Sequence, residues 1–553
     1  MNWQKAGAIA VAMAFTLTTA YSQDISFYGS NNVRFADGTR LNSLQNLQMS
    51  GIGNSSGVTT SFLENWTDLS AVYNDWFATF RYEYDDPSEY GLNRNDIINW
   101  SLYYDKNNYS LNAGTFEELF GRGLTLNLYE DRSIFYDNRL GNGGKFKYDG
   151  NLFSATILKG SNLFYTTLDE STAKQDYNIV TAAEVTISPL NNLNLGVSLV
   201  SVDRDTLSPD GSVLNISNSG FRIKGYERET SFYSIYAAYD ATDWQFYFER
   251  AENNIRSDSD VNGDGFYMAI GKTGGFPNLR MEYKNFRNFA ADPNEIDSPL
   301  GPYQNPPRVQ RRNDLRLFEL DPHFVRYNNE VGYLIEWRLP SISGELQILA
   351  GLGHSSLHDG KRVAPSNDKR MMPYREIFLS LERLGSSRIS YWRINIAASD
   401  EIRYYSELSS IGLVQFRDTD KIALGSEVEF KFGKSLFDIK AELLRFNESD
   451  IRTNPIISFS GKDKGNEYLL AFGYTPSGKF SISTGVEWSD INGDISDRPN
   501  GPWSFVEAKM EFMRNHNVTL WTGKVRGGRQ CSGGVCRYVP DFDGYRISLI
   551  SRF

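Results

Sequence analysis

Apolar and polar residues alternate along most of the chain. In GKFSISTGVEW (478–488), Phe480, Ile482 and Trp488 lie on one face of an extended strand, and Glu487 lies on the other. A period of two marks a β-strand with one apolar and one polar face. The sequence therefore predicts an all-β protein. The same pattern recurs in WFATFRYEY (76–84), NLRMEY (278–283), VGYLIEWR (331–338), KIALGSEVEFKF (421–432), FDIKAEL (437–443) and GYRISLISRF (544–553).

The alternating segments are about ten residues long, which is the length that a tilted strand needs to cross a membrane. A water-soluble β-sandwich would show the same period. However, aromatic residues such as Trp76, Trp337 and Trp488 stand at the ends of the apolar faces, as in the aromatic girdles of a membrane barrel. The polar faces carry acids and bases together, which fits a wet interior. These features favour a transmembrane antiparallel β-barrel.

The connections between these segments alternate in length. Eleven short turns, such as YNDW (73–76) and TPSGK (475–479), alternate with long polar loops. This is the layout of an outer-membrane barrel with short periplasmic turns and long extracellular loops. With a strand near 25–35 and the final strand, the prediction is roughly 22 to 24 strands. The expected long loops are 86–97, 117–142, 161–176, 204–228, 253–264, 287–323, 355–373, 398–421, 447–465, 489–502 and 525–541.

The last ten residues predict how the barrel closes. Tyr545, Ile547, Leu549 and Phe553 should face lipid or its interface, whereas Arg546 and Arg552 should face the lumen. A final strand that pairs with the first one leaves no free edge in the membrane. The barrel assembly machinery of the outer membrane generally reads such a terminal aromatic residue, so both this machinery and outer-membrane lipid are expected partners.

The N-terminus predicts export. Lys5, an apolar run from Ala6 to Leu17 and the small residues Ala20 and Ser22 have the layout of a signal peptide. We therefore expect a signal peptide at 1–22 and the barrel at 23–553, with no folded plug domain before it. The expected location is the outer membrane of a Gram-negative bacterium, with many membrane-crossing strands. The net charge of −11 disfavours nucleic acid as a partner.

The segment 117–142 breaks the alternation and is rich in charge. Glycines on both sides of Arg122 allow a tight turn with positive φ and a projecting guanidinium. One interpretation is an inward loop whose charges narrow the lumen and set its selectivity. The other is that these charges pair with the barrel wall and brace the loop. The pore-lining candidates are Glu117, Glu118, Arg122, Glu130, Asp131, Arg132 and Arg139.

Two other loops carry candidate chemistry. Cys531 and Cys536 are the only cysteines and are expected to form a structural disulfide in an oxidising compartment. A weak Ca²⁺ candidate is the set Asp258, Asp260, Asn262 and Asp264, but Ala269 stands where an EF-hand register needs an acid. An acidic solvated loop is the favoured interpretation of that set, so no cofactor is expected. Without a G-x-S-x-G or H-E-x-x-H motif, the sequence does not predict an enzyme.

Two stretches resemble a known family. GTFEELFGRGLTLNLYEDRSIFYDN (114–138) and RGGRQCSGGVCRYVPDFDGYRISLISRF (526–553) resemble an uncharacterised family of outer-membrane proteins from Bacteroidota, which is known only as a domain of unknown function. The resemblance spans the mature chain. It implies the barrel and its location, and it implies no activity.

The sequence leaves two functions open. The first is a porin-like channel for passive passage of small polar solutes, with a lumen narrowed by loops 117–142 and 287–323. The alternative is a non-conducting surface or assembly barrel that binds an unknown protein partner through its outer loops. Loop 287–323 is Pro-rich and changes from acidic to basic along its length, which is the pattern expected of an interaction loop.

Overall fold

The computed structural model describes the strands of the barrel and parts of the loops that connect them. The described residues are 25–40, 58–86, 94–132, 136–165, 175–207, 228–256, 261–274, 277–289, 303–320, 322–323, 325, 329–340, 345–358, 360, 362–385, 389–408, 413–452, 462–493, 501–532, 535–539 and 541–553. The predicted signal peptide lies outside them and stays a prediction.

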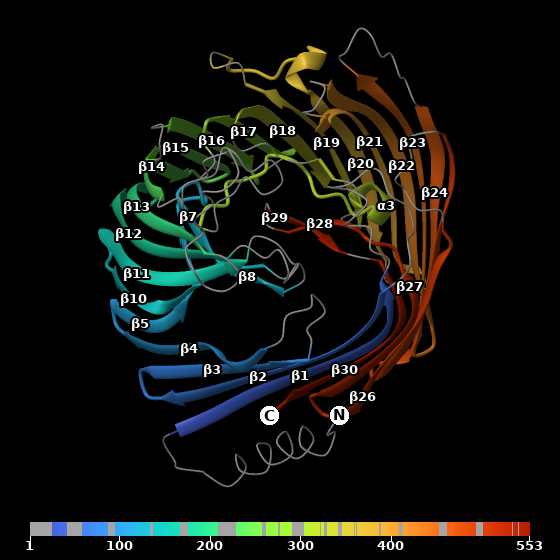
Figure 1. Ribbon diagram of the computed structural model, residues 1–553, viewed down its shortest axis with the longest axis horizontal. Coiled ribbons are helices and arrows are strands. Elements are labelled where there is room, and N and C mark those ends of the chain that lie inside the picture. The colour runs from blue at the N-terminus through green and yellow to red at the C-terminus, as the bar shows by residue number, and fades with distance from the viewer. Residues whose placement is uncertain are drawn as a thin grey trace.

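Twenty-four strands form one closed antiparallel sheet (Figure 1). Each strand pairs with its neighbour along the chain, and β1 pairs with both β2 and β30, which closes the ring. The predicted all-β barrel is confirmed. Its strands are β1 (Ile25–Arg40), β2 (Val58–Tyr73), β3 (Trp76–Asp85), β4 (Arg94–Lys106), β5 (Tyr109–Phe116), β10 (Leu140–Asp149), β11 (Phe153–Tyr165), β12 (Gln175–Leu190), β13 (Leu193–Leu207), β14 (Arg228–Asp240), β15 (Trp244–Arg256), β16 (Val261–Lys272), β17 (Asn278–Arg287), β18 (Asn329–Pro340), β19 (Leu346–Leu357), β20 (Tyr374–Leu384), β21 (Ile389–Leu408), β22 (Leu413–Phe432), β23 (Ser435–Arg452), β24 (Lys462–Ser477), β25 (Phe480–Gly493), β26 (Trp503–Met513), β27 (His516–Val525) and β30 (Phe542–Arg552).

The remaining elements are short and lie in the connections. No helix among the described residues is long and apolar enough to cross a membrane. These elements are β6 (Glu118–Phe120), β7 (Leu126–Leu128), β8 (Glu130–Asp131), β9 (Tyr136–Asp137), β28 (Gly528–Ser532), β29 (Val535–Val539), α3 (Arg316–Glu319) and the 3₁₀ turn η3 (Lys369–Met371).

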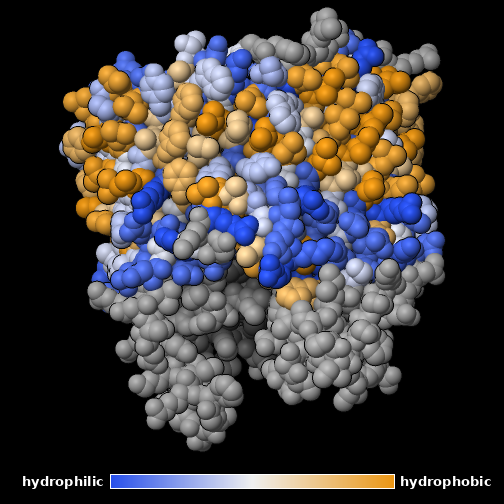
Figure 2. Space-filling model, turned by 90° about the horizontal axis from the view of Figure 1, so that it is seen from above, coloured by the Kyte–Doolittle hydropathy of each residue, from blue (hydrophilic) through white to orange (hydrophobic). Residues whose placement is uncertain are grey.

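The outer surface carries an apolar band, with a polar zone below it in the view of Figure 2. Outward residues of many strands, including Phe80, Ile235, Ile422 and Leu520, are exposed. Such a band is the lipid-facing surface of a membrane barrel. The inward residues of the same strands are mostly polar or covered by the inward segments described below. The period of two in the sequence is therefore the alternation between lipid and lumen.

One predicted loop is wrong. Residues 398–421 were expected to form a long loop, but β21 continues to Leu408 and β22 begins at Leu413. These strands are 20 residues long, about twice the length that crosses a bilayer. Outside the lipid band a strand needs no apolar face, so its residues lose the alternation that would reveal it. The loops expected at 253–264 and 447–465 are shortened in the same way.

The seam between β1 and β30 is closed by the last residue of the sequence. Phe553 and Gly29 exchange two backbone hydrogen bonds, of 2.7 and 2.9 Å. Tyr545, Ile547 and Phe553 are exposed on the outer face, as predicted, and Arg546 lies against Phe542 inside. The predicted closure of the barrel by its terminal strand is confirmed.

We expect Gly29→Ala to weaken this seam. A Cβ atom at position 29 would lie 2.1 Å from the Phe553 ring, so the ring must move away from β1. Because the Phe553 ring is 43% exposed and can turn aside, we expect a loss below the roughly 1 kcal/mol that overpacking of a closed core costs. The measurement is the midpoint of heat-induced unfolding in detergent. Gly478→Ala is the matched control, because a Cβ there meets nothing within 4 Å. Equal midpoints for the two variants would contradict the packing of Phe553 over Gly29.

Candidate functional site

Two segments, residues 117–139 and the segment that carries α3, fold into the lumen inside the ring of strands (Figure 1). In the same view the β28–β29 hairpin between β27 and β30 also projects across the ring. The first inward segment (residues 117–139) connects β5 to β10. It contains two short antiparallel pairs, β6 with β7 and β8 with β9. Its apolar side packs on the inner wall of β11 to β14. This buried cluster contains Phe116, Phe120, Leu126, Leu128, Leu140, Leu158, Val180, Ala182, Val200, Val202, Phe232 and Tyr303.

The second inward segment (described residues between 303 and 325) carries α3 and packs on the inner wall from β15 to β24. In the alternative function, loop 287–323 would bind a partner outside the barrel. Residues 303–320 lie inside the barrel instead, so the prediction is wrong for this part of the loop. Their apolar side chains find partners on the inner wall, which draws the segment inward. The buried cluster contains Leu124, Tyr247, Ala251, Tyr267, Phe286, Phe289, Val309, Leu315, Leu317, Phe318, Val325, Leu334, Phe378, Ala397, Ala423, Leu444 and Leu469.

The two inward segments are bonded to each other. The Asn127 N–H donates to the Tyr303 carbonyl at 2.8 Å, and the Asn305 N–H donates to the Gly123 carbonyl at 3.1 Å. The Gln304 amide nitrogen also donates to the Leu124 carbonyl at 2.6 Å. The segments therefore form a single internal layer within the lumen.

Arg122 stands at the tip of a tight turn in the first segment. Gly121 and Gly123 have φ values of 53° and 84°, the left-handed region that the sequence led us to expect. The Arg122 N–H donates to Glu249 at 2.9 Å, and its guanidinium lies 5.0 Å above the Tyr247 ring. The side chain is exposed, so Arg122 projects from the wall into the lumen.

Glutamates of the wall hold the backbone of both segments. Glu184 accepts from the Gly121 N–H at 3.0 Å. Glu442 accepts from the N–H groups of Arg316 and Leu317 at 3.0 and 2.9 Å, and Glu376 accepts from that of Arg311 at 3.1 Å. Sequence reasoning missed these acceptors. The sequence pattern that could have revealed them is a glutamate on the polar face of a strand, such as Glu442 in FDIKAEL (437–443).

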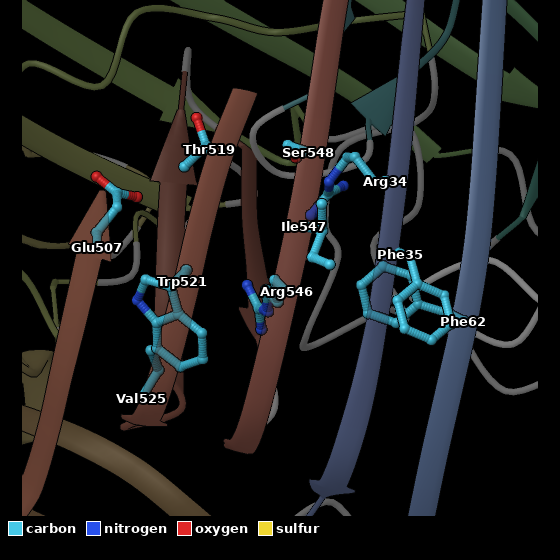
Figure 3. Close-up of a pocket in the computed structure, with 10 residues that line it drawn as sticks. All are labelled: Arg34, Phe35, Phe62, Glu507, Thr519, Trp521, Val525, Arg546, Ile547 and Ser548. Atoms are coloured by element: carbon cyan, nitrogen blue, oxygen red, sulfur yellow. The ribbon is translucent and has the colours of Figure 1, made fainter. Parts of the chain in front are cut away.

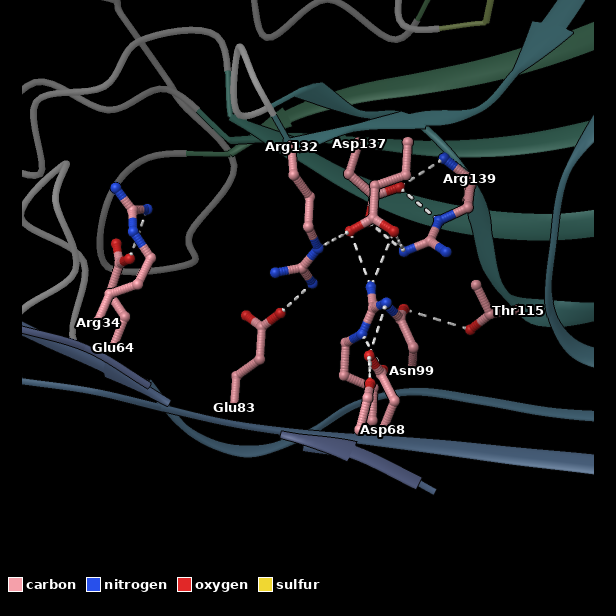
Figure 4. Close-up of polar contacts among 12 residues, drawn as sticks. Arg34, Glu64, Asp68, Glu83, Asn99, Thr115, Arg132, Asp137 and Arg139 are labelled. Carbon is pink, nitrogen blue, oxygen red and sulfur yellow. Dashed lines mark hydrogen bonds and ion pairs between the residues drawn. The ribbon is translucent and has the colours of Figure 1, made fainter. Parts of the chain in front are cut away.

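Glu130 is the centre of the charged candidates, and Figure 4 labels its partners Arg132 and Arg139. Its carboxylate contacts Arg81, Arg132 and Arg139 at 2.8 to 3.0 Å. Arg132 also reaches Glu83 on β3 at 2.6 Å. Burial would raise the pKa of Glu130, but the three guanidinium groups outweigh it and the pKa is lowered. These contacts tie the first segment to the wall at β3.

The remaining candidates of the first segment also have partners. Glu118 pairs with Lys145 at 3.0 Å, and Glu117 is an exposed carboxylate 3.8 Å from Arg139. Asp131 pairs with Tyr136 in the β8–β9 ladder. The interpretation that the charges brace the loop therefore has direct support, and the braced loop occupies the lumen.

His323 anchors the far end of the second segment. Its Nδ1 lies 2.6 Å from Glu401, and its Nε2 lies 3.5 Å from Glu330 and 3.4 Å from the Ser355 hydroxyl. Burial lowers the pKa of His323, but the two carboxylates outweigh this effect and raise it. Serine, histidine and glutamate stand in the order of a hydrolytic triad. Since Ser355 and His323 are buried, a substrate has no access and the arrangement serves as an anchor.

Many lumenal ion pairs share one layered geometry. The glutamate lies at the wall and the arginine covers it on the lumen side. The exposed fractions are 60% for Arg280 against 8% for Glu282, and 32% for Arg132 against 3% for Glu83. For Arg34 and Glu64 they are 22% and 0%. These pairs therefore present guanidinium groups to the lumen, with their carboxylates behind them.

A cavity of about 260 Å³ lies at the seam, where β26, β27, β30, β1 and β2 meet (Figure 3). We call it the seam cavity. It faces the lumen, because Arg34, Trp521 and Arg546 occupy inward positions of their strands. Its lining is Arg34, Phe35, Phe62, Glu507, Thr519, Trp521, Val525, Arg546, Ile547 and Ser548.

The other two candidate sites are only partly described. Cys531 stands opposite Cys536 in the β28–β29 ladder, while their side chains lie outside the described residues, so the disulfide stays a prediction. Of the Ca²⁺ candidates, Asp258 and Asp260 also lie outside them. Asn262 and Asp264 belong to β16, and Asp264 is paired with Arg287. Ca²⁺ binding likewise stays a prediction.

A family model described as a family of unknown function (DUF6029) matches residues 6–338 and 419–553. No curated protein matches the chain. Among solved structures, the outer membrane transporter YddB from Escherichia coli is 9% identical with a TM-score of 0.40, over 95% of this chain and 81% of that one. The copper transporter OprC is 9% identical with a TM-score of 0.43, over 96% and 80%. OpdK from Pseudomonas aeruginosa is 10% identical with a TM-score of 0.37, over 74% and 99%.

Proposed function

We propose that this chain, which belongs to the family of unknown function DUF6029, is an outer-membrane barrel that lets small polar solutes pass through a lumen narrowed by its two inward segments. The passage follows the inner wall of β26, β27, β30 and β1, because Arg316 of the second inward segment already pairs with Glu487 on β25. On the opposite wall the two segments and their buried clusters take up the lumen beside the strands.

The observation that supports this proposal is the character of the seam wall. Its inward residues include Lys509, which is 59% exposed, Glu507, Asn517 and Ser548. The contacts of the two inward segments described above are to strands other than β26, β27 and β30, which carry these four residues. Polar side chains that line a barrel interior and remain accessible are typical of an aqueous channel.

The test is single-channel conductance of the purified full-length protein in planar bilayers. We expect discrete current steps in KCl and uptake of small neutral sugars by proteoliposomes, because the passage is polar and holds both charge signs. A correctly folded barrel, shown by resistance to SDS at room temperature, that never conducts would contradict the proposal. That result would favour the alternative function, a non-conducting barrel that binds a protein partner.

A further inference from the structure

We propose that the lumen favours small anions over small cations, and that the guanidinium of Arg122 is the charge that sets this preference. The inference rests on the proposed passage and names the sign of charge that the passage favours among small polar solutes. Arg122 is exposed at the tip of the first inward segment, so its charge faces the water of the lumen.

The positive charge of Arg122 is not neutralised by an acid. In the described part of the chain, no carboxylate forms an ion pair with its guanidinium, which lies 5.0 Å above the Tyr247 ring. Glu249 holds the same turn, but this glutamate is fully buried. It accepts hydrogen bonds from the Arg122 N–H at 2.9 Å and from the Tyr247 hydroxyl at 2.7 Å. An ion in the lumen therefore meets the guanidinium and not the carboxylate.

A second exposed guanidinium, that of Arg280, follows along the inner wall. The Tyr247 and Tyr267 rings lie 6.1 Å apart, and the Tyr267 hydroxyl donates to Glu282 at 2.6 Å. The same oxygen of Glu282 accepts from Arg280 at 2.8 Å. Arg280 is 60% exposed, whereas its partners Glu282 and Glu336 are 8% and 11% exposed. Here too the lumen meets the cation in front of the acids.

The second inward segment and the seam wall repeat this order. Arg316 is 41% exposed and pairs with Glu487, which is 6% exposed. On the seam wall, Lys509 is 59% exposed and pairs with Glu507, which is 25% exposed. Both sides of the lumen therefore present cations with acids behind them.

Two pairs have the opposite order, with the acid more exposed. Asp314 is 44% exposed against 19% for Arg393, and Glu117 is 60% exposed against 12% for Arg139. Both acids nevertheless have a cation within 3.1 and 3.8 Å. The fields of two opposite charges at such distances largely cancel for an ion farther away. The surplus of positive charge therefore lies at Arg122, which has no such partner among the described residues.

The size of the effect follows from Coulomb's law. In water, one charge at about 10 Å changes the local concentration of a monovalent ion about twofold, upward for anions and downward for cations. The ratio of anions to cations therefore changes by up to about fourfold, and by less as salt screens the charge.

The reversal potential of the full-length protein in planar bilayers, under a gradient of dilute KCl, tests the preference. We expect chloride to be favoured over potassium by about twofold or more, and the ratio to approach one at high salt. This preference is opposite to the one that the net charge of −11 would give. A wild-type barrel that favours potassium would overturn the inference.

Matched variants assign the preference to Arg122. Arg122→Gln should lower the chloride-to-potassium ratio by about twofold or more, and Arg122→Glu should lower it further. Arg370→Gln is the control, because Arg370 is 86% exposed on η3 and its neighbour Lys369 pairs with Asp418 on the outer face of β22 at 3.0 Å. An unchanged ratio in Arg122→Gln would overturn the inference, as would equal losses in Arg122→Gln and Arg370→Gln.

Thiol labelling in detergent separates the charge of the lumen from the passage. With Cys531 and Cys536 replaced by serine, Leu119→Cys puts a single thiol on the first inward segment, where Leu119 is 49% exposed. This position lies at most about 11 Å from Arg122 along the chain. In dilute salt, Arg122→Gln should lower the rate of a negatively charged thiosulfonate relative to a positively charged one by about twofold or more.

The two measurements together distinguish the two proposals. A barrel that carries no current but keeps the labelling ratio that depends on Arg122 retains the positive lumen and loses the passage. A barrel without current whose labelling ratio is the same with and without Arg122 loses both. A barrel that conducts without a preference for chloride loses the anion preference alone.

Discussion

Removal of the first inward segment is expected to raise the single-channel conductance several-fold. Phe116 and Leu140 are direct partners in the β5–β10 ladder, so a short Gly–Asn turn can replace residues 118–138 without stretching the wall. The deletion takes away two short β-ladders and their side chains from the lumen. It also takes away the partners of the second segment at Tyr303 and Asn305.

The barrel should still form after this deletion, because the 24-strand ladder does not include the removed residues. Glu184 and Glu249 lose their backbone partners, but in a wider wet lumen water replaces those hydrogen bonds. The apolar inner residues of β11 to β14 become accessible, which should lower the unfolding temperature without blocking assembly.

The control for conductance is the deletion of a loop segment on the outer surface of the barrel. Residues 362–371 pack on the outer face of β17, where Tyr283 and Asn285 donate to the carbonyls of Val363 and Arg362. Their removal should leave the conductance unchanged. If the inner deletion also left it unchanged in a folded barrel, the first segment would not limit the passage.

The sequence was sufficient to predict the barrel because lipid on one side and water on the other impose a period of two on each membrane-crossing strand. It failed for the extended parts of β21 and β22, where no lipid imposes that period. In the terminal strand the prediction is confirmed for Tyr545, Ile547 and Phe553 on the outer face and for Arg546 inside, since apolar and charged residues alternate there.

The sequence indicated the first inward segment but not how the wall holds it. The cluster of charge around Arg122 drew attention to residues 117–142. Their partners Glu184 and Glu249 are 63 and 127 residues away from the donors they bind, and only the folded barrel brings them together. The second segment had a local signal in Leu315, Leu317 and Phe318, three apolar residues close together between charged ones. The seam cavity combines Arg34 and Arg546 from opposite ends of the sequence.

Loss of the Glu130 charge is expected to release the first segment from the wall. Glu130→Ala leaves Arg81, Arg132 and Arg139 close together without their shared carboxylate. Breaking a buried ionic cluster costs about 3 kcal/mol, at the low end of the usual range here because Arg132 keeps Glu83 and Arg139 keeps Asp137. We expect noisy, larger currents and a lower unfolding temperature. Glu117→Ala is the matched control, because that carboxylate is 60% exposed and 3.8 Å from Arg139.

The same cluster predicts how the currents respond to acid. Because the folded pKa of Glu130 is lowered from 4.5, its contribution to stability is complete above pH 4.5 and is lost as the pH falls through the lowered value. The wild-type currents should therefore stay quiet at pH 4.5 and become noisy only in stronger acid. Glu130→Gln cannot carry the charge at any pH, so its currents should be noisy at neutral pH and show no such transition. A wild-type transition that persists unchanged in Glu130→Gln would assign the acid response to another group and remove Glu130 from the centre of the brace.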